Sequence, residues 1–182
     1  MFSMPLGEGL ELRLLEPRHA EEVFEAVDAN RERLREWLPW VDHARSPNDT
    51  RGFLSMQMAR LAHGEAMTAG VWVDGLFAGV VEGRLDSERS VMDLGYWLAR
   101  SFEGRGVMTR ACRELLRYAF EDLRYARVEL RCATENQRSC AVAERLGMQL
   151  DGVLRSAMPL RDRRLDLRVY SLLAADWKAR GA

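Results

Sequence analysis

The chain has 182 residues, of which 47% are hydrophobic and 30% charged, with a formal net charge of −1. This size and composition suit one globular domain spanning residues 1–182. A nearly neutral chain has no global field that would attract nucleic acid or an anionic membrane. We find no apolar run as long as a membrane span and no secretory signal pattern, so we expect a cytoplasmic protein.

The cysteines and the basic residues give weaker indications. Cys112, Cys132 and Cys140 fall in helix or strand patterns, which favours buried free thiols. No spacing of His, Cys and Asp forms a ligand set, so no metal is expected. The arginines at 161, 163 and 164 fit either a solvated turn or a ribosomal-RNA contact; without a basic stripe, a nucleic-acid-binding module is not expected.

The first third of the chain predicts one strand followed by helices. Leu10–Leu15 alternates apolar and polar residues, as a strand does, whereas Arg18–Ala29 and Asn30–Leu38 show helical spacing. Ser46-Pro47 is a helix-start signal, and that helix is expected to reach about Ala62.

After residue 64 the pattern changes to that of strands. Asp74-Gly75 is a strong hairpin signal between two apolar runs. The elements expected from here are strands Ala66–Val73, Leu76–Leu85 and Ser90–Arg100, helix Val107–Leu123, strand Ala126–Thr134, helix Gln137–Leu146, and strands Met148–Leu160 and Leu165–Ala174. This order predicts an α/β fold whose mixed, mostly antiparallel sheet has about seven strands flanked by helices.

The most informative segment is Phe102–Thr109, which joins an apolar strand pattern to a helix pattern. Gly104 and Gly106 leave backbone N–H groups uncovered at the start of the helix, where the helix dipole adds partial positive charge. Such a turn can hold a pyrophosphate. It lacks the third glycine of a dinucleotide-binding fingerprint and the Gly-Lys-Ser/Thr of a P-loop.

A second segment, Asn136–Met148, supports a particular interpretation of this turn. Together the two segments resemble the GCN5-related N-acetyltransferases (GNAT), which show Gln/Arg-x-x-Gly-x-Gly/Ala and, further on, an Asn, a small residue and a Gly-Phe pair. Gly104 and Gly106 match the first motif, with Ser101 in place of Gln or Arg. In the second motif the matches are Asn136, Ser139 and Gly147, and Met148 replaces Phe.

Two further runs, Trp37–Val41 and Leu94–Leu98, narrow the likeness to the RimJ/RimL-type branch, which acetylates N-terminal α-amines of ribosomal proteins. The resemblance implies acetyl-CoA as co-substrate, a sheet splayed at its middle strands, and the possibility of a homodimer. It implies cofactor contacts from Leu98, Ala99, Glu103, Gly104, Arg105, Gly106, Val107, Met108, Thr109, Asn136 and Ser139.

Acetyl transfer from a thioester needs proximity, an oxyanion donor and proton handling. On the resembled pattern, the backbone N–H near Leu98 is the oxyanion donor. Ala143 stands where many members have a tyrosine acid, so Ser139 is assigned as donor to the CoA sulfur. Asn136 would bond the pantetheine amide. The alternatives are a helix-surface serine at 139 and a helix cap at 136.

The general base is not evident, because Met158 occupies the position where the resembled branch has a proposed glutamate. Asp93 and Asp166 are substitutes, each with a structural or substrate-orienting role as the alternative. An α-amine of pKa about 7.7–8.0 is already roughly a tenth deprotonated at neutral pH, whereas lysine is almost fully charged. A site without a strong base therefore favours α-amines.

Trp37, Trp40, Tyr96 and Asp166 are expected to bind the acceptor, with core or strand packing as the alternative for the aromatic residues. The leading prediction is an acetyl-CoA-dependent N-acetyltransferase acting on a protein N-terminus, for instance of a ribosomal protein. A small amine, such as an antibiotic, polyamine or toxin, is a second acceptor class. A non-catalytic acyl-CoA-binding protein is the third possibility.

Overall fold

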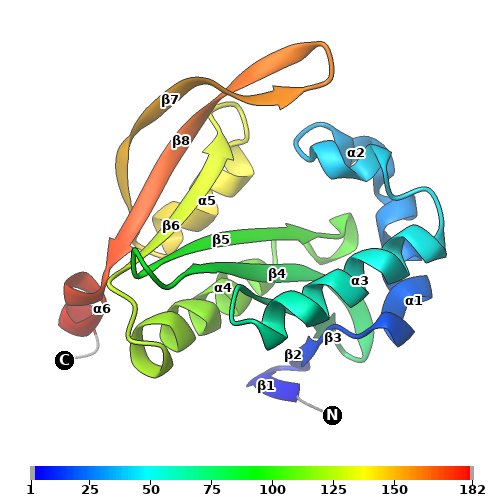
Figure 1. The fold of residues 1–182 in the computed structure, drawn as a ribbon, viewed down its shortest axis with the longest axis horizontal. Coiled ribbons are helices and arrows are strands. Elements are labelled where there is room, and N and C mark those ends of the chain that lie inside the picture. Colours follow the sequence, from blue (N-terminus) through cyan, green and yellow to red (C-terminus); the bar gives the residue numbers. More distant parts are fainter. Residues whose placement is uncertain (1–2, 181–182) are drawn as a thin grey trace. The chain divides into compact units, whose positions relative to one another are not determined.

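The computed structural model describes residues 3–180. Its contacts divide the chain into two compact units. The first unit is the chain up to Glu82 together with Tyr96–Ala111, and the second is Gly83–Gly95 together with the chain from Cys112 onward. Within the described residues, backbone pairing joins eight strands in the order β1-β2-β3-β4-β5-β6-β8-β7 (Figure 1). The predicted α/β class is thereby confirmed.

The first unit contains the amino-terminal strands and helices. Its strands are β1 (Ser3–Gly7), β2 (Leu10–Leu14), β3 (Ala66–Val73) and, shared with the second unit, β4 (Leu76–Asp86) and β5 (Val91–Leu98). Its helices are α1 (Ala20–Ala29), α2 (Arg31–Arg35), α3 (Pro47–Ala62) and the first turn of α4 (Val107–Arg117). Strands β1, β2 and β3 pair antiparallel, with Leu12 opposite Val71.

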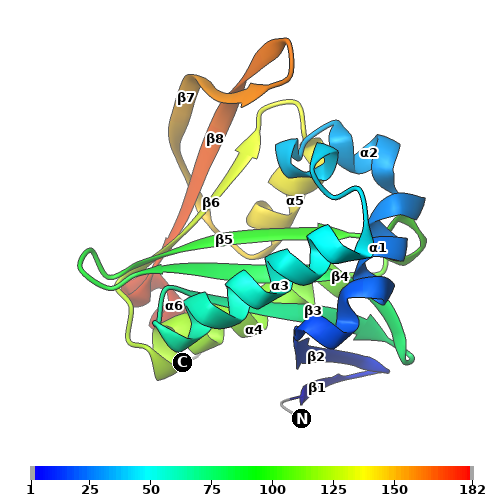
Figure 2. The ribbon, with the colours of Figure 1, turned by 45° about the vertical axis from the view of Figure 1, so that its right-hand side comes forward.

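The core of the first unit lies between these helices and one face of the sheet. Helix α3 packs against β3 and beside α1 (Figure 2). The aromatic side chains of Trp72, Phe77 and Trp97 stack edge to face along the sheet, with ring centroids 5.1 and 5.8 Å apart. Apolar residues of α1 and α3, including Val23 and Leu54, close over them. This packing places the end of β5, which carries Trp97, beneath the helical layer.

The second unit is built on the carboxyl-terminal strands. It contains β6 (Arg127–Ala133), α5 (Gln137–Arg145), β7 (Gln149–Leu160), β8 (Arg163–Leu173) and α6 (Ala174–Arg180). Strands β7 and β8 form a long antiparallel hairpin, and β8 also pairs with β6 (Figure 1). Strands β5 and β6 pair in parallel, from Val91 opposite Arg127 to Leu94 opposite Leu130. Among residues 3–180, no helix is long and apolar enough to cross a membrane.

The predicted elements agree with the structure except at a few places. The sheet has eight described strands where about seven were expected, because Ser3–Gly7 forms an additional edge strand. The helix predicted to reach Leu123 ends at Arg117 and continues as a five-residue π-helical segment, Tyr118–Asp122. Helix α6 has no counterpart in the prediction, which ended on a strand.

Candidate active site

The glycine turn lies where the sequence placed it, between the end of β5 and the start of α4. Gly104 has φ +74° and Gly106 φ +70°, a left-handed backbone that favours glycine. Both glycines and Arg105 are exposed, so their backbone N–H groups are reachable from solvent. Exposed left-handed glycines before an 11-residue helix fit a pyrophosphate.

Side chains on either side of the turn have different surroundings. Val107 and Met108 are buried in the core, and Thr109 is half-buried. The side chains of Val107 and Met108 are therefore not available to a ligand. The Arg105 guanidinium lies 5.9 Å from the centre of the Phe102 ring, which keeps a cation at the turn.

The peptide unit that joins Leu98 to Ala99 is held at both ends. The Leu98 carbonyl accepts a hydrogen bond of 2.6 Å from Arg33, and the Ala99 N–H donates to the Ala78 carbonyl at 2.7 Å. Strand β4 approaches this point closely, since Gly79 faces Trp97 and Leu98 backbone atoms with no room for a Cβ. The oxyanion role of the Leu98 N–H stays a prediction, but the backbone around it is rigidly placed.

Arg33 and Asn30, at the junction of α1 and α2, were not singled out by the sequence. Arg33 also donates to the Glu103 carboxylate at 2.6 Å, and the Arg100 N–H donates to Asn30 Oδ1 at 2.9 Å. These partners are 65 to 70 residues apart in the chain. No local periodicity or motif signals such a contact.

The aromatic residues expected to bind the acceptor differ in exposure. Trp40 is 39% exposed and its ring lies 6.4 Å from that of the buried Trp97. Trp37 and Tyr96 are half-buried. Trp40 therefore has the most apolar surface available for a ligand, while the acceptor role of all three remains a prediction.

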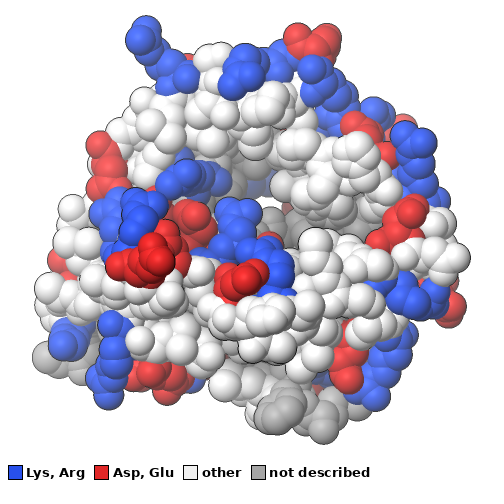
Figure 3. Space-filling model, in the orientation of Figure 1, with Lys and Arg blue, Asp and Glu red and all other residues white. Residues whose placement is uncertain are grey.

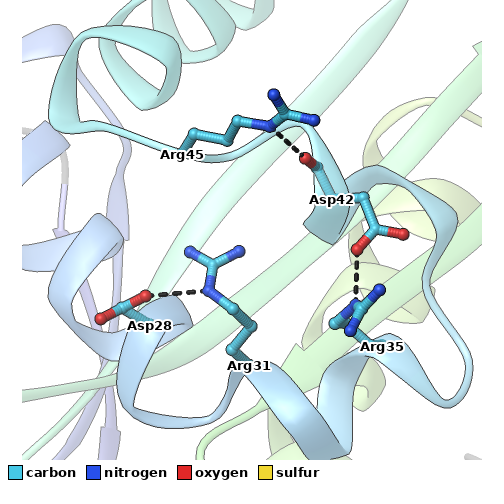
Figure 4. A pocket seen from close by; sticks show the side chains of 5 residues that line it. All are labelled: Asp28, Arg31, Arg35, Asp42 and Arg45. Atoms are coloured by element: carbon cyan, nitrogen blue, oxygen red, sulfur yellow. Dashed lines mark hydrogen bonds and ion pairs between the residues drawn. The ribbon is translucent and has the colours of Figure 1, made fainter.

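A pocket of about 630 Å³ is formed by residues of α1, α2 and the segment between α2 and α3 (Figure 4). It is lined by Asp28, Arg31, Arg35, Asp42 and Arg45. The charges pair within the wall, Arg31 with Asp28 at 2.8 Å and Arg35 with Asp42 at 2.5 Å. Arg31 also donates to the carbonyls of residues 41 and 44, so it holds the turn after α2 in place. The two carboxylates are thus neutralised by neighbouring arginines.

In the second unit, Asn136 and Ser139 lie at the start of α5. Asn136 is the N-cap residue, and its Oδ1 accepts a hydrogen bond of 3.1 Å from the Ser139 N–H. Ser139 is half-buried. The cap explains why the helix begins at this asparagine. The ligand roles of Asn136 and Ser139 stay predictions.

A thiol pair lies beneath the same helix. Cys132 on β6 and Cys140 on α5 are both buried, with their sulfur atoms 3.5 Å apart. Burial, followed by the hydrogen bond with Cys140, raises the pKa of Cys132 to about 12. The Cys132 thiol therefore stays protonated at neutral pH and packs as a small apolar group.

The two carboxylates considered as bases both have structural partners. Asp93 forms an ion pair of 3.9 Å with Arg131. Asp166 accepts a hydrogen bond of 2.7 Å from the Ser156 N–H, which fixes the irregular part of the β7–β8 hairpin. Met158 lies on β7 opposite Leu165 and is half-buried. The base and substrate roles of the aspartates stay predictions.

A buried carboxylate next to Asp93 was missed by the sequence analysis. Glu129 is 7% exposed and receives hydrogen bonds of 2.8 Å from both Arg127 and Arg131. Burial raises the pKa of Glu129 and is the largest single effect, but the hydrogen bonds and positive charges of Arg131 and Arg127 together outweigh it, so the pKa lies below its ordinary value. An ionised, doubly paired carboxylate of this kind holds β6 together and does not act as a base.

Positive and negative side chains are mixed on one face of the protein. On the face drawn in Figure 3, lysine and arginine lie beside aspartate and glutamate in small clusters of both signs. Such interspersed charge gives this face no extended field of one sign for a polyanion.

Comparison with known proteins identifies the family. The sequence model of the acetyltransferase (GNAT) domain family matches residues 9–149. The putative ribosomal N-acetyltransferase YdaF of Bacillus subtilis (strain 168) is 36% identical over 180 residues, which is 98% of each chain. The chain therefore belongs to the GNAT acetyltransferase family. It is an N-acetyltransferase whose co-substrate is acetyl-CoA.

Solved structures extend the likeness over nearly the whole chain. RimL, a ribosomal α-N-protein acetyltransferase in complex with coenzyme A, matches with a TM-score of 0.92 at 25% identity, covering 96% of this chain and 99% of that one. The microcin self-immunity acetyltransferase MccE, in complex with acetyl-CoA and AMP, matches with a TM-score of 0.88 at 25% identity, covering 92% and 94%. The expected family and co-substrate are thus confirmed.

Proposed function

We propose that the protein acetylates the N-terminal α-amine of a protein, and that this protein is ribosomal. The similarity to a putative ribosomal N-acetyltransferase and to RimL, over 98% and 96% of the chain, carries this proposal. Met158 supports it, because a site without a strong base at this position favours an amine that is already partly deprotonated at neutral pH.

Acetyl-CoA supplies an acetyl group that is already activated as a thioester. The residues of this chain therefore mainly position the two substrates and polarise the thioester carbonyl. We propose that the exposed N–H groups of Gly104, Arg105 and Gly106 bind the pyrophosphate. The Leu98 N–H would donate to the carbonyl oxygen as it gains negative charge. The Ser139 hydroxyl would donate to the departing sulfur, and the Asn136 amide would bind the pantetheine arm. Each of these roles is a proposal.

A panel of acceptors tests the acceptor class. Thiol release from acetyl-CoA would be measured with peptides that begin with free Ser, Ala or Met, with N-terminally blocked lysine peptides, with polyamines and with aminoglycosides. Turnover on free α-amines alone is expected. Efficient turnover on blocked lysine peptides at neutral pH would contradict the argument from Met158.

The same assay tests the Ser139 assignment. Ser139→Ala is expected to lower kcat by about a hundredfold or more, the usual effect of removing a general acid. Ser55 offers a matched control, because its hydroxyl donates to the Arg51 carbonyl on the exposed surface of α3. Ser55→Ala should leave kcat unchanged; an equal loss in both variants would contradict the donor role.

A small-molecule acceptor is the second candidate, favoured by the likeness to MccE. A pocket with unpaired carboxylates would suit a polycationic amine, but Asp28 and Asp42 are paired with arginines. Turnover on small amines alone would replace the first proposal with this one. Tight coenzyme A binding without turnover on any amine would favour a non-catalytic acyl-CoA-binding protein.

A cytoplasmic location and a homodimer are further proposals. The first rests on the ribosomal acceptors named for the relatives, and the second on the family resemblance alone. Fractionation of cells that produce the protein and sedimentation of the purified chain test them.

A further inference from the structure

The junction between α1 and α2 holds the segment that leads from β5 into the glycine turn. Asn30 and Arg33 make three contacts with this segment, at Leu98, Arg100 and Glu103. Asn30 is itself fixed, since its side-chain amide donates to the Ala26 carbonyl at 2.8 Å. The contacts therefore link this segment to α1. They involve the backbone segment that is proposed to bind acetyl-CoA.

Arg33 uses its two terminal nitrogens for different purposes. Nη1 donates to the Glu103 carboxylate and Nη2 to the Leu98 carbonyl, both at 2.6 Å. Its Nε is buried and has no hydrogen-bond partner among the described residues. The orientation of the guanidinium is therefore set by Glu103 and Leu98, with a weaker contact of 3.4 Å from Nη2 to Asn30.

The contact with Glu103 has an electrostatic consequence for the turn. Glu103 directly precedes Gly104, so its carboxylate lies at the turn proposed to receive two phosphate charges. The Arg33 and Glu103 side chains are each only 23% exposed, which limits screening of their charges by solvent. Arg33 neutralises a carboxylate that would otherwise repel the phosphates.

We infer that Arg33 is a positioning residue for acetyl-CoA: it cancels the charge of Glu103 at the turn and fixes the Leu98 carbonyl at the end of β5. The inference rests on the proposed role of the turn and of Leu98. It predicts two effects of replacing Arg33: a loss of coenzyme A affinity through charge, and a loss of kcat through backbone geometry.

The charge effect is tested by calorimetric titration of coenzyme A into Arg33→Gln, Glu103→Gln and the double variant. Arg33→Gln should weaken binding by about tenfold, because it removes the cation that bonds the Glu103 carboxylate at 2.6 Å. A tenfold change in Kd corresponds to about 1.4 kcal/mol. Glu103→Gln in the Arg33→Gln background should restore most of the loss.

The geometric effect is tested with Arg33→Lys. A lysine keeps the positive charge, but its single ammonium lacks the planar fork that bonds the carboxylate and the carbonyl together. Arg33→Lys should therefore bind coenzyme A nearly as tightly as the wild type while kcat falls by about tenfold or more, since misplaced backbone near the reacting atoms slows the reaction.

Arg35→Gln is the matched control, because Arg35 lies on the same helix and pairs with Asp42. It should leave coenzyme A affinity unchanged. Urea unfolding of each variant separates loss of folded protein from loss of affinity. The inference is wrong if folded Arg33→Gln binds like the wild type, if Glu103→Gln restores nothing, or if Arg35→Gln has the same effect. If the wild type itself does not bind coenzyme A, the proposed role of the turn fails instead.

Discussion

Replacement of Gly79 by alanine should disturb the end of β5 directly. A Cβ at position 79 would lie 2.9 Å from the Leu98 Cα and closer still to the Trp97 carbonyl oxygen, whereas ordinary contacts begin at 3.4 Å. Both obstacles are backbone atoms, and the contact with the Trp97 carbonyl oxygen is the shorter, so β4 and β5 must separate by about 1 Å at this point. Overpacking of this kind destabilises a protein by about 1–3 kcal/mol.

Because Leu98 is the proposed oxyanion donor, the same displacement should reduce kcat by about tenfold or more; a 1 Å misplacement can cost about a hundredfold. Urea unfolding and acetyl-CoA-dependent thiol release measure the two effects.

Gly83→Ala, on the same strand, is the matched control. Its Cβ would meet the Met92 side chain, with the sulfur at 2.5 Å. A flexible thioether can move aside, so the change in stability should stay within about 1 kcal/mol. Wild-type kcat in Gly79→Ala, or an equal loss in Gly83→Ala, would refute the argument that backbone contact at Gly79 positions Leu98.

Three other substitutions test the local structure. Glu129→Gln should lower the free energy of unfolding by about 1–3 kcal/mol at neutral pH, because Arg127 and Arg131 lose their shared buried partner and keep Asp151 and Asp93. Because the Glu129 pKa is depressed, the wild-type advantage should be complete above the ordinary value of 4.5 and be lost as pH falls through the depressed pKa. Ser46→Ala should lower the stability by about 1 kcal/mol in urea unfolding, since Ser46 Oγ caps α3 through the Asp49 N–H. Gly106→Ala should destabilise the fold by about 1 kcal/mol, the cost of a left-handed conformation for a residue with a Cβ. Because the turn is the proposed pyrophosphate site, coenzyme A affinity measured by calorimetry should fall by more than this amount. Unchanged values in these measurements would contradict the respective assignments.

Much of the fold follows from local signals. Asp74 and Gly75 both adopt positive φ, 51° and 79°, as a type I′ hairpin turn requires. The Asp-Gly pair alone is therefore enough to predict this turn. Ser46 caps α3 as its position before a proline indicates. The missed edge strand at Ser3–Gly7 and the missed α6 are short elements whose formation depends on neighbours more than on their own patterns.

In the candidate site, too, the features that depend on neighbouring residues were predicted, and those that depend on distant residues were not. The glycine turn and the Asn136 cap were found from sequence because each works through residues adjacent in the chain, where φ angles and helix ends have strong residue preferences. The partners of Asp93 and Asp166 were not found, because ion pairs and hydrogen bonds between strands depend on register.

The sequence by itself determined the family, the co-substrate class and the position of the glycine turn, since these reside in short motifs with local conformational requirements. Only the tertiary structure decided which side chains surround that turn. Arg33 reaches Leu98 and Glu103 across 65 and 70 residues because the α1–α2 junction packs against the end of β5. Contacts of this kind are selected by the packing of the whole unit, and no periodicity within either segment encodes them.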